Sequence, residues 1–219
     1  IGLTFDYIII HETGHEWWGN SVSCNDMADM WIHESFCTYS EAIYVECMHG
    51  YDTAMLYVNA KKPTVDNKAP IVGIYGVNEE GDGDMYNKGM LFLNTLRHHI
   101  NNDPLWWGII KSMSDTVFKQ RVISYNDIVE YMSERTSMKL QPIFDQYLKH
   151  AAIPTFEYTL KKVKGKEYEL SYRWVTDVPG FEMRAYLIVD GKPLWVDADN
   201  NWFRTGISIA KEKEFRVDE

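Results

Sequence analysis

The spacing of hydrophobic residues changes once along the chain, close to Pro154. Before that point, apolar positions recur three and four residues apart, which is the period of amphipathic helices. After it, apolar and polar residues alternate, which is the period of strands in a half-buried sheet. The pattern therefore predicts an α+β protein, with a helical domain over residues 1–153 and a small antiparallel β domain over residues 154–219.

Capping and turn residues divide the first domain into helices. Five predicted helices have both ends marked: about Phe5 to Gly19, Asn25 or Asp26 to Met48, Tyr86 to Asn101, Ser124 to Thr136 and Leu140 to Ala152. Two more are marked only at their start, a third helix near Tyr51 and a fifth helix at Pro104. Between the third and fourth helices, two prolines and four glycines between residues 63 and 83 predict a surface loop.

The second domain carries two strand signals. Phe156, Tyr158 and Leu160 alternate with polar residues, and the alternation resumes after a turn at residues 164–165. Further along, Asp190-Gly191 lies between two β-prone runs and is the strongest hairpin signal in the chain. We expect a small antiparallel sheet or sandwich.

Candidate chemistry is concentrated in the first predicted helix, which contains His11-Glu12-Thr13-Gly14-His15. Residues four apart lie on one face of a helix, so His11 and His15 can present imidazole nitrogens to one metal ion. Glu12 is turned about a quarter of the way round the helix and can reach a metal-bound water without binding the metal. Eighteen residues separate His15 from Glu34, which offers a carboxylate from the second helix. A catalytic zinc keeps three protein ligands and one open position, so we predict one Zn²⁺ per chain on His11, His15 and Glu34, with Glu12 as general base.

The residues around these positions resemble a known family. His11 to Asn20 reads HETGHEWWGN, Trp31 to Phe36 reads WIHESF, and Met85 to Gly89 reads MYNKG. These segments are similar to the HExxHxWWGN, W-x-x-E-[GS]-F and Tyr-x-Lys-Gly motifs of the M1 family of zinc aminopeptidases (gluzincins). Three motifs spread over about eighty residues make this a specific resemblance.

The resemblance implies a mainly α-helical, thermolysin-like catalytic domain, present in part, followed by a small antiparallel β-sandwich domain. It implies hydrolysis of peptide bonds at the N-terminus of peptides, with Tyr86 stabilising the oxyanion and Lys88 positioning its loop. The family places a Gly-x-Met-Glu-Asn segment and a β domain before the zinc helix, and neither precedes His11 in this sequence. We therefore expect a fragment of a longer enzyme, with peptides as substrates and the missing N-terminal domain of the same protein as partner.

Other functions are compatible with the same residues. A zinc endopeptidase or an epoxide hydrolase would use the same metal site. A non-catalytic peptide-binding module would be expected to have lost Glu12 or a metal ligand, and all of these are intact. Glu41 lies two helical turns after Glu34, so it either receives the second ring N–H of a zinc-bound histidine or is a solvated charge.

Charge and hydropathy argue against nucleic acid as a partner and against a membrane-spanning helix. A formal net charge of −10 argues against nucleic acid, because nothing offsets phosphate repulsion. No apolar run approaches the roughly 20 residues that a membrane helix needs. The three cysteines do not form an even disulfide framework, and we expect core thiols at Cys24, Cys37 and Cys47. We expect Trp17 and Trp18 to pack against the pair of helices that carries the candidate ligands. We also expect structural roles for four polar residues: Glu16, His33, His98 and His99.

Overall fold

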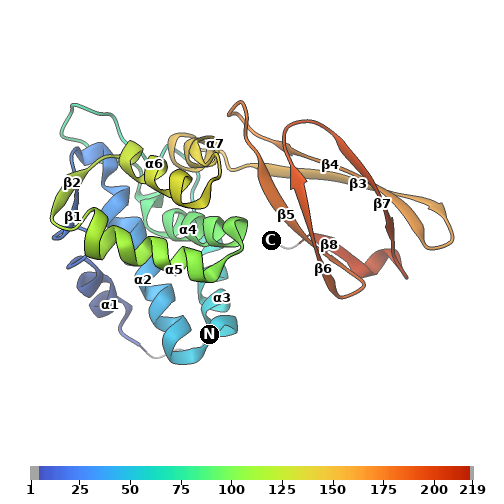
Figure 1. The fold of residues 1–219 in the computed structure, drawn as a ribbon, viewed down its shortest axis with the longest axis horizontal. Coiled ribbons are helices and arrows are strands. Elements are labelled where there is room, and N and C mark those ends of the chain that lie inside the picture. Colours follow the sequence, from blue (N-terminus) through green and yellow to red (C-terminus); the bar gives the residue numbers. More distant parts are fainter. Residues whose placement is uncertain (1–4, 218–219) are drawn as a thin grey trace. The chain divides into compact units, whose positions relative to one another are not determined.

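The computed structural model describes residues 5–217, which form two compact units, one up to Ala152 and one from Ile153 onward. Helices dominate the first unit and antiparallel strands make up the second (Figure 1). The predicted α+β class is confirmed. The outermost residues of the two expected domains, 1–4 and 218–219, lie outside the described residues.

The first unit contains seven α-helices within its described part, and shorter helical turns extend or precede several of them. The α-helices are α1 (Tyr7–Gly14), α2 (Trp31–His49), α3 (Tyr51–Asn59), α4 (Asn87–Ile100), α5 (Asp103–Ser112), α6 (Tyr125–Thr136) and α7 (Gln141–Phe144). The 3-10 turns are η1 (Met27–Asp29), η2 (Lys62–Thr64) and η3 (Gly83–Met85), and the π-helical turns are η4 (Met113–Val117) and η5 (Asp145–Lys149). A parallel pair that the sequence did not predict joins β1 (Val22–Cys24) to β2 (Arg121–Ile123).

Helix α2 is the centre of the first unit, because it packs against α1, α3 and α4. Trp31, Phe36 and Val45 on α2 are buried although they point in different directions round the helix, as expected for a helix that neighbours cover on several sides. In α4, Leu93, Leu96 and Ile100 are buried, whereas Leu91 is only half-buried.

The first helix is shorter than predicted: α1 ends at Gly14 and not at Gly19. After His15 the chain folds back, since the N–H of Asn20 donates to the His15 carbonyl at 2.9 Å. Trp18 then bridges to Val22, and Gly19 takes a φ of 139°, which disfavours a side chain. The bridge from Trp18 to Val22, the first residue of β1, therefore replaces the helix that the pattern of residues 15–19 predicts.

The second helix begins later than predicted. Asp26 caps the short turn η1, where its side chain accepts from the N–H of Ala28, and α2 starts only at Trp31. Its end is close to the prediction, because Gly50 stops the helix with a φ of 85°. The helix predicted from Ser124 is confirmed, with a capping box between Ser124 and Asp127. The last predicted helix is shorter, since α7 and η5 together end at Lys149.

The predicted surface loop before α4 is largely exposed, yet its path is fixed by close backbone contacts. A Cβ added to Gly81 would lie 1.7 Å from the carbonyl oxygen of Ile71, so only glycine fits there. The N–H of Gly73 donates to the carbonyl of Ala28 at 2.9 Å. The buried carboxylate of Asp84 accepts the two backbone N–H groups of residues 66 and 67. These contacts fix the approach to α4.

The second unit consists of two three-stranded antiparallel sheets with the strand orders β3-β4-β7 and β6-β5-β8. Their strands are β3 (Thr155–Lys164), β4 (Glu167–Val175), β5 (Met183–Val189), β6 (Lys192–Ala198), β7 (Phe203–Ser208) and β8 (Phe215–Val217). The predicted hairpin joins β5 to β6, with positive φ at Asp190 and Gly191, as a tight two-residue turn requires. Leu170 and Leu187 from the two sheets are fully buried.

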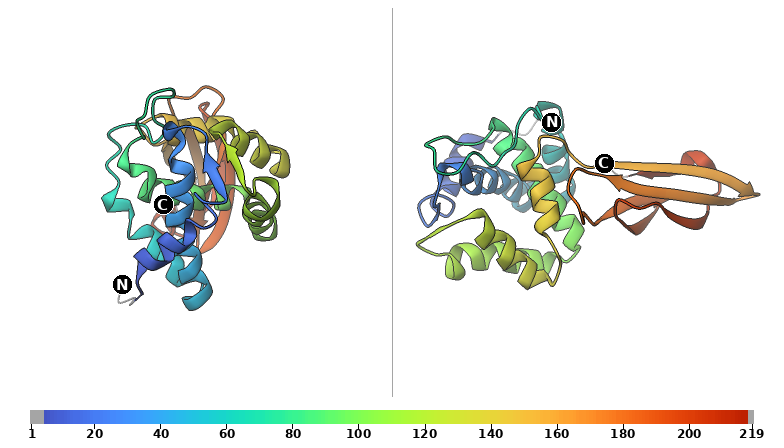
Figure 2. Two further views of the ribbon diagram at one scale, coloured as in Figure 1. Left: turned by 90° about the vertical axis from the view of Figure 1, so that its left-hand side faces the viewer. Right: turned by 90° about the horizontal axis from the view of Figure 1, so that it is seen from above.

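Figure 2 gives two further views of the helices and strands. Within the described part of the chain, none of the helices has both the length and the apolar composition that spanning a bilayer requires.

Candidate metal centre

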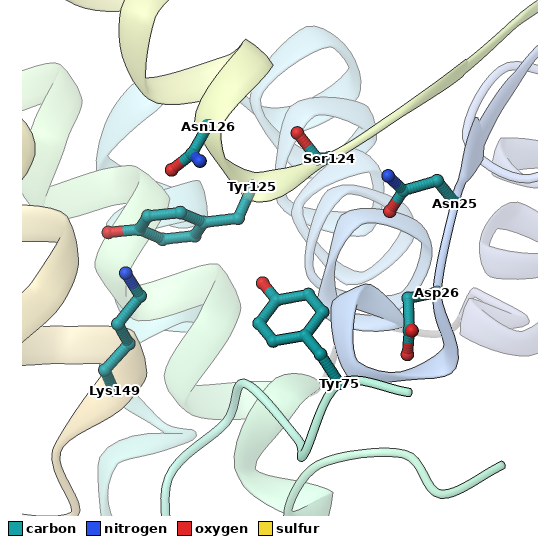
Figure 3. Close-up of a pocket in the computed structure, with 7 residues that line it drawn as sticks. All are labelled: Asn25, Asp26, Tyr75, Ser124, Tyr125, Asn126 and Lys149. Carbon is teal, nitrogen blue, oxygen red and sulfur yellow. The ribbon is translucent and has the colours of Figure 1, made fainter. Parts of the chain in front are cut away.

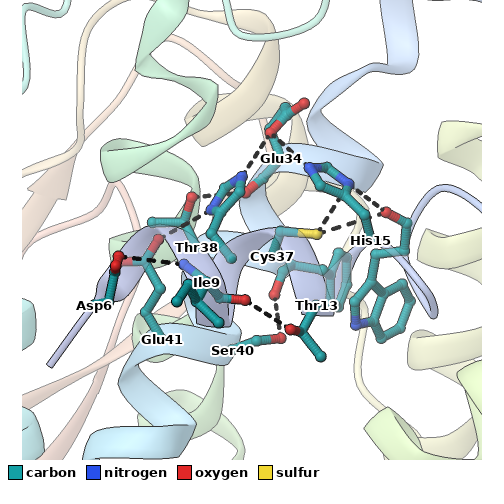
Figure 4. A network of polar contacts seen from close by, with 12 residues as sticks. Asp6, Ile9, Thr13, His15, Glu34, Cys37, Thr38, Ser40 and Glu41 are labelled. Atoms are coloured by element: carbon teal, nitrogen blue, oxygen red, sulfur yellow. Dashed lines mark hydrogen bonds and ion pairs between the residues drawn. The ribbon is translucent and has the colours of Figure 1, made fainter.

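The three predicted ligands meet where α1 packs against α2. The Nε2 atom of His11 lies 3.1 Å from Oε2 of Glu34, and Nε2 of His15 lies 3.7 Å from the same oxygen. Figure 4 shows the carboxylate of Glu34 above the His15 ring. Gly14 permits this approach, since a Cβ at that position would already lie 3.3 Å from Sγ of Cys37. The helix pair thus brings one oxygen and two nitrogens together.

The ring orientations fit a metal ion bound through Nε2 of both histidines. Nδ1 of His15 lies 3.0 Å from the carbonyl oxygen of Trp18, to which it donates when it carries the proton. Nδ1 of His11 lies 3.0 Å from Oε1 of Glu41. With bonds of about 2.0–2.2 Å, the ligand atoms of a tetrahedral zinc lie roughly 3.3–3.5 Å apart, close to the separations from Glu34. The donor set and its spacing therefore fit one zinc ion.

The electrostatics of the centre favour a cation. Hydrogen bonds to Glu34 and Glu41 raise the pKa of His11 to about 9, although burial opposes the shift. Burial acts to raise the pKa of Glu34, but the hydrogen bond from His11 and the charges of nearby histidines lower it overall. A protonated His11 between two carboxylates occupies a site that a metal ion would compete for.

Glu41 lies behind His11 and is almost fully buried. One of its oxygens contacts Nδ1 of His11, and the other accepts a hydrogen bond from the hydroxyl of Tyr57. Of the two roles that the sequence left open, the solvated charge is wrong. The carboxylate is placed to orient the imidazole of His11.

Cys37 is a neighbour of the centre that the sequence analysis did not foresee. Its Sγ lies 3.3 Å from Nδ1 of His15, and the ligand atoms of Cys37, His11 and His15 all lie within 4.8 Å of one another. However, the thiol is on the Nδ1 side of His15, away from Glu34, and burial raises its pKa. These facts favour the carboxylate as third ligand. The position of Cys37 three residues after Glu34, one helical turn on, was the available signal.

The prediction that all three cysteines are buried in the core holds for only some of them. Cys37 is buried, Cys24 is half-buried and Cys47 is exposed, and all three are free. The prediction for Cys47 is therefore wrong. It lies near the C-terminal end of α2.

Tyr86 and Glu12 lie near the candidate ligands. The Tyr86 ring precedes α4, and its centroid is 5.9 Å from that of His11. Burial raises the pKa of the Tyr86 phenol, and the negative charges of Glu34, Glu80 and Glu12 add to the effect. Tyr86 is 39% exposed and Glu12 is exposed, so both side chains are accessible to solvent.

The other residues singled out from the sequence turn away from the centre. Lys88 is buried and its Nζ donates to the carbonyls of His150 and Ala151 at 3.3 and 2.9 Å. His33 accepts the backbone N–H of Cys24, which ties α2 to β1. Burial lowers the pKa of His33, in keeping with a neutral structural histidine.

The two tryptophans after the histidine motif differ from each other. Trp18 is buried and stacks on Phe36 with ring centroids 4.1 Å apart, so it does wall the helix pair. Trp17 is 47% exposed, and the same expectation is wrong for it. The turn after His15 thus leaves one of two neighbouring rings buried and the other largely exposed.

A separate polar pocket of about 240 Å³ lies elsewhere on the first unit and contains none of the predicted site residues (Figure 3). It is lined by Asn25, Asp26, Tyr75, Ser124, Tyr125, Asn126 and Lys149. The fully buried carboxylate of Asp29 accepts from the Tyr75 hydroxyl and the Tyr125 backbone, which joins the loop to the start of α6. These contacts give the pocket residues a structural role.

Comparisons with known proteins identify one peptidase family. The family model described as the Peptidase family M1 domain matches residues 4–147. Endoplasmic reticulum aminopeptidase 1 of Mus musculus is 26% identical over 129 residues, which are 54% of this chain and 14% of that protein.

Solved structures share the fold. The structure of Legionella pneumophila aminopeptidase A in complex with aspartic acid covers 94% of this chain with a TM-score of 0.74 and 16% identity. The M1 zinc metallopeptidase from Deinococcus radiodurans covers 68% with a TM-score of 0.58 and 22% identity. The chain spans 25% and 34% of these two structures, and 14% of the mouse protein.

Proposed function

Because the chain belongs to peptidase family M1, we propose that it forms the zinc centre of a metallopeptidase that releases N-terminal residues from peptides. The observation that carries this proposal is the convergence of His11 and His15 on the carboxylate of Glu34. The sequence relatives and solved structures named above are aminopeptidases or zinc metallopeptidases, which supports the same reaction class.

In this proposal His11, His15 and Glu34 hold one zinc ion, and Glu41 keeps His11 oriented through Nδ1. Zinc, when bound, supplies Lewis acidity that lowers the pKa of water and polarises a carbonyl group. Glu12 and Tyr86 are both exposed, and Glu12 lies near enough to Tyr86 to help raise the pKa of its phenol. A peptide carbonyl would therefore enter between these two side chains.

Glu12 is proposed as the general base. Its carboxylate follows the first ligand in α1 and accepts a proton from the attacking water, then delivers that proton to the departing amine nitrogen. The Tyr86 hydroxyl is proposed to donate a hydrogen bond to the carbonyl oxygen as negative charge develops on it. Its raised pKa keeps the phenol protonated at neutral pH, as a donor must be.

Exchange of Glu12 for glutamine tests the proposal, because it removes the base without removing a ligand. In the protein that contains this chain, we expect Glu12→Gln to retain one zinc per chain and to lose turnover of a leucyl or alanyl amide by about a hundred- to ten-thousandfold. Zinc is measured by elemental analysis after chelation and reloading, with His15→Ala as the variant that should lose it.

Glu16→Gln is the matched control, since Glu16 is an exposed carboxylate four residues further on. It should leave both zinc and turnover unchanged. Near-normal turnover in Glu12→Gln would contradict the assignment of the base. A zinc content well below one, or one unchanged by His15→Ala, would refute the metal site itself.

A further inference from the structure

Ser35 joins the metal-binding helix to the segment that carries Tyr86. Ser35 directly follows Glu34 in α2, and its Oγ donates to the backbone carbonyl of Met85 at 2.7 Å. Ser35 is fully buried and Met85 is 2% exposed, so water does not compete for this hydrogen bond. One contact therefore links the neighbour of a proposed ligand to the neighbour of the proposed oxyanion donor.

The Ser35 side chain fits closely against α4. Helices α2 and α4 pack closely. A Cβ added to Gly89 would lie 2.0 Å from Oγ and 2.6 Å from Cβ of Ser35. Glycine at position 89 is thus required by the serine side chain, and the two residues together set the separation of the helices.

Lys88 holds the same segment from its other side. Its ammonium donates to the carbonyls of His150 and Ala151 and is buried, which lowers its pKa. Tyr86 therefore lies between two buried attachments, one through the Met85 carbonyl and one through Lys88. The two attachments restrict the backbone that carries the phenol.

The phenol also meets the metal-ligand candidates directly, because a hydrogen bond with Glu34 is among the causes of its raised pKa. Tyr86 is 39% exposed, and its ring meets the ring of His11 at a centroid distance of 5.9 Å. Its reach toward Glu34 and His11 is set by the backbone that carries the ring. A displacement of about 1 Å in a reacting group can cost roughly a hundredfold in rate.

We propose that Ser35 is a positioning residue for the reaction: its hydrogen bond to the Met85 carbonyl sets the place of the Tyr86 phenol relative to the metal ligands. This inference rests on the proposed function for its kinetic consequence. Its structural part concerns the Tyr86 ring and can be tested without turnover.

A double-mutant cycle provides the kinetic test. Ser35→Ala should lower kcat roughly ten- to a hundredfold, with KM within about twofold and one zinc per chain. In a Tyr86→Phe background the same exchange should have almost no further effect, because the hydroxyl that it positions is already gone. Equal losses in both backgrounds, or an unchanged kcat in Ser35→Ala, would overturn the proposal.

Two further variants serve as a control and as a replacement for Ser35→Ala. Ser40→Ala is the matched control, since the Ser40 hydroxyl bonds at 2.8 Å to the Phe36 carbonyl of its own helix and should not affect kcat. Ser35→Gly removes the same hydroxyl with the other residue that the family motif admits, and it replaces Ser35→Ala if that variant does not fold. A loss in Ser40→Ala as large as in Ser35→Ala would count against a specific role.

Fluorine NMR of protein labelled with 3-fluorotyrosine tests the positioning directly. The chain has 14 tyrosines, and the Tyr86 resonance is the one missing from Tyr86→Phe. Ser35→Ala should shift or broaden that resonance, and Ser40→Ala should leave it in place. An unchanged Tyr86 resonance in Ser35→Ala refutes the inference even if the enzyme proposal stands. A changed resonance supports it even if no peptidase activity is found.

Discussion

Tyr86 shows how one phenol depends on its surroundings at the scale of a residue. Burial and three nearby carboxylates disfavour its ionisation and keep the O–H bond available for donation. Tyr86→Phe removes the donor and leaves the ring. We expect kcat to fall about a hundred- to a thousandfold while KM changes little, because the hydrogen bond matters most as the oxyanion forms. Steady-state kinetics on an alanyl amide measure the split.

Tyr75→Phe is a suitable control, since the Tyr75 hydroxyl bonds to Asp29 and belongs to the separate pocket. It should leave kcat unchanged. If Tyr86→Phe changed only KM, the residue would be a binding group and the oxyanion donor would be another side chain.

Glu41 acts at the same scale through the ring of His11. Glu41→Gln retains the size of the side chain and weakens the acceptor that faces Nδ1. Because such partners orient metal-binding histidines, we expect zinc affinity to fall about ten- to a hundredfold with the fold retained. Competition with a fluorescent zinc chelator measures the affinity. Glu16→Gln should not alter it, and an equal affinity in Glu41→Gln would show that His11 is oriented by other contacts.

At the scale of the elements, Arg97 holds three helices together. Its guanidinium, only 3% exposed, forms a bidentate pair with Glu46 of α2 and reaches Asp103 of α5, while Arg97 itself belongs to α4. The cation also lies 4.6 Å above the ring of Trp107. A single side chain thus fixes the ends of α2 and α4 to the start of α5.

Arg97→Met should lower the free energy of unfolding by roughly 3 kcal/mol at neutral pH, because it leaves the two carboxylates without their partner. The hydrogen bond from Arg97 lowers the pKa of Asp103. A lowered folded-state pKa stabilises the protein above the unfolded value of about 3.9, and this part is lost as the pH falls through the folded value. The difference between wild type and variant should therefore shrink below about pH 4.

Urea unfolding at pH 7 and at about pH 3 measures this difference. Arg135→Met, in the last turn of α6, is a control for the loss of a positive charge at a helix end. A difference that stays constant over this pH range would mean that the Asp103 contact contributes nothing to stability.

At the scale of the whole molecule, the two units differ in their expected response to metal. All proposed ligands lie in the first unit, and a ligand stabilises only the structure that it binds. We expect zinc to increase hydrogen-exchange protection in α1 and α2 and to leave strands β3 to β8 unchanged. Exchange measured by mass spectrometry, with and without chelator, tests this. Protection that rose equally in both units would show that metal binding couples them.

The local features of this chain followed from its sequence. The histidine pair four residues apart, the alternation after Pro154 and the turn at Asp190-Gly191 depend on neighbours a few residues away. The capping box at Ser124 likewise acts within one turn. For these features a pattern of a few residues contains the whole physical cause, so the presence of the helical segments, the hairpin and the histidine pair could be predicted.

Other features were decided only when distant segments met. Helix α1 ends at Gly14 because Trp18 pairs with Val22, and the strand pair β1 and β2 joins residues about a hundred positions apart. The thiol of Cys37 behind His15 and the bond from Ser35 to Met85 likewise arise from helix packing. The side chains that can hold a metal ion could be identified from the sequence. The tertiary structure decided how they are oriented, because the energy of a hydrogen bond depends on distance and angle across elements that no local pattern relates.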